Sequence, residues 1–372
     1  MCRLADKKSN LFIKVEKLPS ASQLYAFKQD EFQFDANNHI GKGAFGVIYK
    51  GSFQSRTAGN GAPAGRTPVA IKNNMQGSIK EDNAEVLLQT KLFCIVREKA
   101  AIYKNKLQTS VHRFVNHFRR FDMAKIPKPY FAASYAGYKT KNGKQIKKVW
   151  RFVGMEVLDQ AFVPYVIQHG FNVMPELVRQ LACLLKFLQD TMAFMHGDMH
   201  GLNVMVRGTG QSARMYLIDF GMSSYNEGGK RHSVDTRYSH FTQENPYVDF
   251  LMFLSHCQET FARKGQKESS LWCANIVMPF WNSLRRELKS PGDVQFTTMF
   301  GDPQHIVRSA QNRNLKKLAY AHHILYERAQ HLRYTTSPVD MIIYIDTNTY
   351  GKKPPKSVEG WTGIETGITH SW

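Results

Sequence analysis

The chain of 372 residues carries 50 lysines and arginines against 30 acidic residues, which gives a net charge of +20. That length suggests about two domains, and the charge favours acidic partners, either nucleic acid or acidic protein segments, without bearing on the fold. No stretch has the length and apolarity of a signal peptide or a spanning helix, and the five cysteines are scattered without a Cys-x-x-Cys pair. The sequence therefore predicts a soluble, intracellular protein, cytoplasmic or nuclear.

The first motif is a group of glycines that comes after an N-terminal extension, residues 1–35, in which no motif occurs. Gly41, Gly43 and Gly46 are spaced Gly-x-Gly-x-x-Gly between β-type residues. Glycines at this spacing allow a strand, a turn and a second strand whose backbone amides approach phosphates without a Cβ in the way. The pattern alone fits a plain glycine-rich hairpin equally well, so it gains weight only from the motifs downstream of it in the chain.

A lysine ends the next apolar strand, where residues 69–72 read Val-Ala-Ile-Lys. Lys72 can there reach the α and β phosphates of a nucleotide, and it needs a carboxylate partner on the following helix. Ser78 and Glu81 form a capping box, in which Glu81 turns back to the first amides of the helix. We therefore expect Glu85, one turn further on, to pair with Lys72; the alternative is that Glu85 is an exposed helix charge.

Residues 97–151 hold 15 lysines and arginines against two acids. Apolar residues between 111 and 121 recur there at helical spacing, with arginines between them. We interpret this region as a basic insertion, about 97–128, whose amphipathic helix packs on the first domain with a solvated charged face. The alternative is a docking surface for nucleic acid or an acidic protein, whose binding would weaken as salt rises.

A turn and an apolar stripe come after this basic region. The sequence Lys-Asn-Gly-Lys at 141–144 predicts a hairpin turn that joins a strand at about 130–138 to a strand at about 147–158. Leucines and methionines then recur at helical spacing from 177 to 195, which predicts a buried helix leading into His196. We expect the second domain to begin near Asp159.

Residues 195–203 read Met-His-Gly-Asp-Met-His-Gly-Leu-Asn, and an Asp-Phe-Gly sequence begins downstream at Asp219. A carboxylate can accept a proton from an attacking hydroxyl, a role that we assign to Asp198. Asn203 and Asp219 offer the hard oxygen ligands that Mg²⁺ prefers, and they predict a site for the metal ion on the phosphates of a nucleotide. Together these groups have the chemistry of phosphoryl transfer.

In these motifs and their order, from residue 41 to about residue 249, the chain resembles the protein kinase superfamily. The resemblance implies an α+β, bilobal fold with a small β-rich first lobe over 36–158, a larger and mostly α-helical second lobe over 159–350 and an irregular tail over 351–372. It also implies ATP and Mg²⁺ as cofactors, Met155 at the back of an adenine pocket, and the backbone of Glu156 and Leu158 at the adenine edge. The other nucleotide contacts that it implies are Ile48, Ala70 and Met205 around the adenine, and Gly41, Gly43, Gly46 and Lys72, paired to Glu85, on the phosphates.

Three departures from the kinase pattern carry predictions. Gly197 stands where many protein kinases have an arginine that reads a phosphate on the activation segment, so we expect activity without activating phosphorylation. His200 replaces a lysine, resembles the His-Gly-Asp-x-His loop of small-molecule phosphotransferases, and would clamp the γ-phosphate more weakly. No Ala-Pro-Glu comes after Asp219, and this divergence resembles the kinases of large DNA viruses. Asp249, in competition with Asp235, is expected to brace the catalytic loop.

The sequence thus predicts a serine/threonine protein kinase that transfers the γ-phosphate of ATP to protein hydroxyls. One alternative is a small-molecule phosphotransferase of the aminoglycoside or choline type, which His200 favours. The other is a pseudokinase or basic scaffold that binds nucleic acid or an acidic protein; the presence of Lys72, Asp198, Asn203 and Asp219 argues against it. A viral origin would place the protein in the host cell or the virion.

Overall fold

The computed structural model describes residues 13–15, 26–27, 32–42, 46–54, 66–74, 79–109, 123–141, 144–234, 248–274 and 276. The described part mixes helices and strands, so the predicted α+β class is confirmed, while a kinase-like arrangement of two lobes stays a prediction. The chain divides into two compact units. Unit 1 comprises Met1–Glu98, Ile126–Leu158 and Asp219–Gly221, and unit 2 comprises Lys99–Lys125, Asp159–Ile218 and Met222–Trp372.

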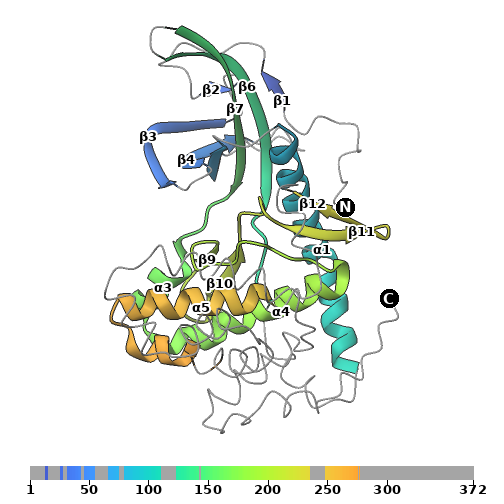
Figure 1. Cartoon of the computed structure of the whole chain (residues 1–372), viewed down its shortest axis with the longest axis vertical. Coiled ribbons are helices and arrows are strands. Elements are labelled where there is room, and N and C mark those ends of the chain that lie inside the picture. The colour runs from blue at the N-terminus through green and yellow to red at the C-terminus, as the bar shows by residue number, and fades with distance from the viewer. Residues whose placement is uncertain are drawn as a thin grey trace, which may run out of the picture. The chain divides into compact units, whose positions relative to one another are not determined.

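Unit 1 contains a seven-stranded sheet with the strand order β1-β6-β7-β5-β4-β3-β2 (Figure 1). Its strands are β1 (Ile13–Val15), β2 (Ala26–Phe27), β3 (Phe32–Lys42), β4 (Gly46–Gln54), β5 (Arg66–Asn74), β6 (Pro129–Lys141) and β7 (Lys144–Glu156). The hairpin β6–β7 is longer toward its turn than predicted, because a two-residue connection leaves strand pairing unbroken up to Lys141 and Lys144. The adjacent β5 and β7 are the strands that carry Lys72 and the predicted adenine-binding segment.

A long helix, α1 (Ile79–Thr109), comes after β5. Val86 of α1 is buried with Ala132 of β6 and Val153 of β7, so the first part of the helix packs on the sheet of unit 1. Residues 97–109, the first part of the predicted basic insertion, continue α1, because no proline or glycine interrupts the helix; the insertion itself stays a prediction. The amphipathic helix predicted around 111–121 lies outside the described residues.

Unit 2 combines helices with two small sheets. Its described helices include α3 (Phe162–His169), α4 (Met174–Met192) and α5 (Val248–Arg263), with short 3-10 turns η2 (Phe171–Val173) and η3 (Gly210–Ser212), and residues 267–274 are helical as well. The sheets are β10-β9-β8, made of β8 (Gln160–Ala161), β9 (Val204–Arg207) and β10 (Arg214–Leu217), and the hairpin of β11 (Ser224–Glu227) with β12 (Lys230–Ser233).

The core of unit 2 is built around α4, which is buried along nearly its whole length. Phe162 of α3 packs against Phe253 and Phe261 of α5. The apolar stripe of α4 was predicted to run to Met195, but the helix ends at Met192, because the next residue, Ala193, adopts a left-handed conformation with φ 44°. The chain therefore leaves the helix just before the His-Gly-Asp sequence.

Several predictions fall outside the described residues, namely those for Gly43, Ser78, Asp235 and the tail at 351–372, and the side chain of Glu81 is not described either. Within the predicted N-terminal extension, β1, β2 and the start of β3 join the sheet of unit 1. Over the part of the chain that the structure describes, no helix has both the length and the apolarity to cross a bilayer.

Candidate active site

The charged cluster of unit 1 is centred on Lys72 of β5. Its Nζ donates a hydrogen bond to Oε1 of Glu85 at 2.8 Å and another to Oδ1 of Asp219 at 3.1 Å. The Lys72 side chain is only 11% exposed, so these two carboxylates meet the ammonium group largely out of water. The predicted pairing of Lys72 with Glu85 is confirmed, and Asp219 is a second partner that the sequence did not predict for this lysine.

The electrostatics of this cluster keep Lys72 charged. Burial by itself lowers the pKa of a lysine, but the charges of Glu85 and Asp219 and their hydrogen bonds outweigh it, so the pKa of Lys72 lies above its usual range. Asp219 has a left-handed backbone with φ 64°. Such a conformation is uncommon for residues other than glycine, although aspartate tolerates it better than most, and it recurs at functional sites.

The predicted adenine-binding residues of unit 1 lie on β5, on β7 and just after β7. Ala70 pairs with Met155 across these strands, and Met155 packs partly buried against the cluster formed by α1, β6 and β7. The amide of Glu156 donates to the carbonyl of Lys128 at 2.9 Å. A contact of the Glu156 backbone with a base would therefore use the carbonyl oxygen. Leu158, also predicted at the adenine edge, is buried.

The predicted phosphate-binding glycines lie on the neighbouring strands β3 and β4. Gly41 of β3 pairs with Ile48 of β4, and Ile48 in turn pairs with Lys72 of β5. Gly46 is the first residue of β4. Gly41, Ile48 and Lys72 thus stand in register across three adjacent strands, whereas Met205, also predicted to contact the adenine, lies on β9 in unit 2.

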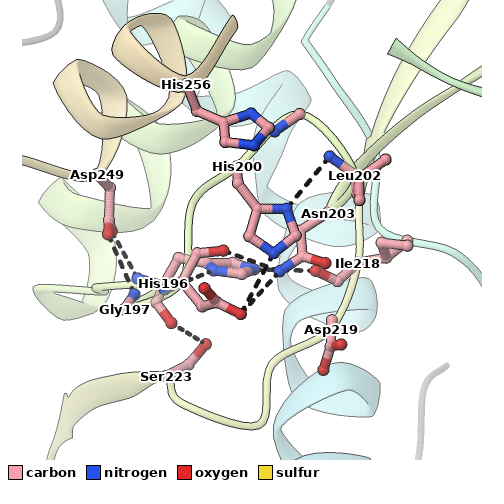
Figure 2. Close-up of polar contacts among 12 residues, drawn as sticks. His196, Gly197, His200, Leu202, Asn203, Ile218, Asp219, Ser223, Asp249 and His256 are labelled. Carbon is pink, nitrogen blue, oxygen red and sulfur yellow. Dashed lines mark hydrogen bonds and ion pairs between the residues drawn. The ribbon is translucent and has the colours of Figure 1, made fainter. Parts of the chain in front are cut away.

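The candidate catalytic loop of unit 2 comes after α4, and it brings the side chains of Asp198, His200 and Asn203 together. Figure 2 shows His200 and Asn203 of this loop. Nδ2 of Asn203 donates to the backbone carbonyl of Asp198 at 2.8 Å and to Oδ2 of Asp198 at 3.2 Å. Nε2 of His200 lies 3.5 Å from the same Oδ2. Both bonds of Asn203 use its nitrogen, so its amide oxygen is the atom suited to bind a cation.

The hydrogen bonds of the loop decide where its histidines carry their protons. Nδ1 of His200 accepts the amide of Leu202 at 3.2 Å, and Nδ1 of His196 accepts the amide of Asp198 at 3.3 Å. A nitrogen that accepts has no proton, so we assign the Nε2–H tautomer to both rings. Nε2 of His200 then faces Asp198 as a donor, and Nε2 of His196 donates to the carbonyl of Ile218 at 2.9 Å.

These neighbours set the charge of Asp198. Burial by itself raises the pKa of a carboxyl, but the hydrogen bond and electrostatic attraction of His200, the electrostatic attraction of His196 and the hydrogen bond of Asn203 outweigh it. The pKa of Asp198 is therefore below its ordinary value. Asp198 is a carboxylate at neutral pH, and it is a weaker base than an ordinary aspartate.

Asp249 braces the catalytic loop from α5, as predicted. It is fully buried, and its two carboxylate oxygens accept the backbone amides of His196 at 2.6 Å and Gly197 at 3.1 Å. Figure 2 shows both bonds reaching from Asp249 to the backbone at His196 and Gly197. A buried carboxylate with two amide donors fixes the direction in which the following residue leaves the turn.

Gly197 is required where the loop meets the residues after Phe220-Gly221. Its φ is 81°, and a Cβ on this residue would lie 2.5 Å from the carbonyl oxygen of Met222. Only glycine fits such a backbone approach without displacing its neighbour. An arginine would bring that same Cβ, so glycine at residue 197 has a steric reason in this fold.

Sequence reasoning missed two contributors to the loop. Nδ1 of His256, on α5, accepts the amide of Gly201 at 3.1 Å, and the His256 ring lies 5.5 Å from that of His200. Arg231, on β12, donates to the carbonyl of Ala193 at 2.6 Å. No local pattern marks either residue, because each acts on backbone that lies far away in the sequence.

No protein-family model matches the chain, and no curated protein sequence matches it. A functional interpretation of the chain therefore depends on the residues themselves and on the motif resemblance.

Proposed function

We propose that the chain is an ATP-dependent serine/threonine protein kinase, in which Lys72 binds the α and β phosphates and Asp198 acts on the acceptor hydroxyl. The observation that supports this most strongly is the cluster of Lys72, Glu85 and Asp219. A purely structural ion pair has no need of a second carboxylate with a left-handed backbone. A lysine that binds phosphates must hold its ammonium group in a fixed position, and the two carboxylates fix the ammonium group of Lys72.

Asp198 would orient the acceptor hydroxyl and take its proton. Because its pKa is lowered, Asp198 is a poor base for a free alcohol, whose proton is held tightly. The proton becomes acidic only as the hydroxyl oxygen bonds to phosphorus, so Asp198 would accept it late, while the bond to the β-phosphate oxygen breaks. The bond from Asn203 and the contact with His200 hold Oδ2 of Asp198 and leave Oδ1 for the hydroxyl.

The residues that would hold the nucleotide and its metal ion have donor sets that suit them. Asn203 keeps its amide oxygen for a cation, and Asp219 provides a carboxylate. Mg²⁺ bound to such oxygens would neutralise charge on the phosphates of the nucleotide. The carbonyl of Glu156 and the amide of Leu158 are the backbone groups that we assign to the adenine edge.

A second candidate function is phosphoryl transfer to a small molecule, and one observation favours it. His200 directs Nε2–H toward Asp198, and the sequence of this loop resembles the His-Gly-Asp-x-His loop of small-molecule phosphotransferases. An imidazole is a weaker clamp for the γ-phosphate than the permanent charge of a lysine. The Gly-x-Gly-x-x-Gly strands and the Val-Ala-Ile-Lys strand favour the protein kinase.

The test is transfer of label from γ-labelled ATP with Mg²⁺, using the full chain, mixed protein acceptors and a panel of aminoglycosides and choline. Asp198→Asn removes the base but keeps the shape of the side chain. Asp159→Asn is the matched control, because Asp159 is an exposed aspartate that accepts one backbone amide, that of Gly208, at 2.8 Å. We expect the wild type and Asp159→Asn to label serine and threonine, and Asp198→Asn to lose about 10²-fold or more in rate.

Label found only on a small molecule would replace the proposal with the second candidate. Binding of ATP with no label on any acceptor would leave the pseudokinase or scaffold. Equal transfer by Asp198→Asn and the wild type would remove Asp198 from the mechanism.

A further inference from the structure

The hairpin β11–β12 comes after the Asp-Phe-Gly sequence. Backbone groups and a serine hydroxyl, none of them phosphorylated, hold this hairpin against the catalytic loop. Met195 and Ser224 exchange two backbone hydrogen bonds, each 2.9 Å long. The hydroxyl of Ser223 donates to the carbonyl of His196 at 2.9 Å. These bonds attach the start of the hairpin to the two residues that precede Gly197.

The hairpin has its own internal order. Its turn is Gly228-Gly229, with φ 56° and 74°, which are the two positive φ angles that a type I′ turn requires. Next to the turn, Glu227 pairs with Lys230, and further along, the rings of Tyr225 and His232 stack at 5.2 Å. The turn, the strand pairing and the ring stacking therefore position β12, and with it the side chain of Arg231.

Arg231 links this hairpin to the end of α4. Its Nη1 donates to the carbonyl of Ala193 at 2.6 Å, and its Nη2 donates to the hydroxyl of Ser224 at 2.5 Å. Ala193 is the left-handed residue that ends α4, where carbonyl groups lack helical partners and carry the partial negative charge of the helix. A guanidinium group suits that position, since it is always charged and can bind two acceptors at once.

We propose that Arg231 is a positioning residue that holds the catalytic loop and the segment after Asp-Phe-Gly in their working arrangement without a phosphate on that segment. The catalytic part of this inference depends on the proposed kinase function. A phosphate-reading arginine at residue 197 is sterically excluded, whereas Arg231 supplies a permanent cation from the segment after Asp-Phe-Gly itself. Through Ala193 and Ser224 it fixes the backbone on both sides of the Met195–Ser224 bridge, which leads directly to His196 and Asp198.

The alternative is that Arg231 only stabilises its hairpin. The test compares Arg231→Met and Arg231→Lys with Lys230→Met in the full chain, after phosphatase treatment. Lys230 is the exposed neighbour on β12, so its substitution removes the same charge without touching Ala193 or Ser224. We expect kcat to fall about ten- to hundred-fold in Arg231→Met, because a catalytic loop that is displaced by even a small distance loses about this much in rate.

The pattern of kinetic constants separates positioning from stability. We expect KM for ATP to stay within about two-fold of wild type, because the nucleotide contacts assigned to Lys72 and Glu156 are untouched. Arg231→Lys should recover part of kcat, since an ammonium group can still reach one of the two acceptors. Losses in kcat that match those of Lys230→Met, or a wild type that phosphatase inactivates, would overturn the proposal.

Amide hydrogen exchange tests the link independently of kinase activity. The amides of Met195, Ser224 and Val234 all donate within the loop and hairpin, at 2.9, 2.9 and 3.0 Å. They should exchange faster in Arg231→Met and at the wild-type rate in Lys230→Met, while α4 stays protected in both. A wild type that transfers no phosphate would refute the proposed function, and amide exchange alone would then decide whether Arg231 holds the hairpin to the catalytic loop. Unchanged exchange in Arg231→Met would refute that role of Arg231.

Discussion

Substituting Gly197 with alanine should destabilise the fold by more than an ordinary glycine-to-alanine change at positive φ. The left-handed backbone at φ 81° costs an L-residue about 1–2 kcal/mol. The new Cβ would also lie 2.5 Å from the carbonyl oxygen of Met222, which is backbone and cannot rotate away. Such overpacking typically adds about 1–3 kcal/mol, so we expect a total loss of about 2–5 kcal/mol in the free energy of unfolding.

The control that isolates the contact is Gly265→Ala, at φ 71°, where an added Cβ meets nothing within 4 Å. This variant should lose only the backbone cost, about 1–2 kcal/mol. Urea denaturation of both variants and the wild type measures the two losses side by side. Equal losses would show that Met222 moves aside at no cost, and the steric reason for glycine at residue 197 would then be wrong.

Three further predictions concern the charged groups. Asp249→Asn should lose about 1.5–3 kcal/mol of stability, because an amide can accept only one of the two buried N–H groups, whereas exposed Asp159→Asn should lose no more than about 1 kcal/mol; denaturation compares them. Lys72→Met should destabilise by about 3 kcal/mol, and adding Glu85→Gln should restore part of this because fewer buried charges remain unpaired; an additive double-mutant cycle would contradict the coupling. The pKa of Asp198 is lowered in the folded protein, so the stability that its carboxylate contributes is present above the ordinary aspartate pKa and is lost as the pH falls through the lowered value. The pH dependence of kcat/KM checks this lowered pKa. A fall in kcat/KM between about pH 5.5 and 7 that the Asp198→Glu variant shifts would refute a lowered pKa for Asp198.

The sequence alone identified the groups that lie close together along the chain. Asp198, His200 and Asn203 occur within six residues, so one turn of backbone can bring them together wherever the loop sits. Lys72 at the end of an apolar strand and Glu85 one turn into the next helix are likewise separated by only 13 residues. Their pairing was expected because the kinase motifs call for a carboxylate on that helix and the capping box at Ser78 already uses Glu81. The α+β class was expected from the resemblance of these motifs to the protein kinase superfamily.

Only the tertiary structure decided which distant groups complete these local arrangements. Asp219 joins Lys72 across 147 residues, Asp249 reaches the amide of His196 across 53, and Arg231 reaches the carbonyl of Ala193 across 38. Each contact requires two groups that are distant in the sequence to lie within hydrogen-bond distance in the fold. No periodicity in the sequence predicts which two groups these are. The same reason explains why a glycine that looked like a missing arginine is a steric requirement, set by the carbonyl of Met222.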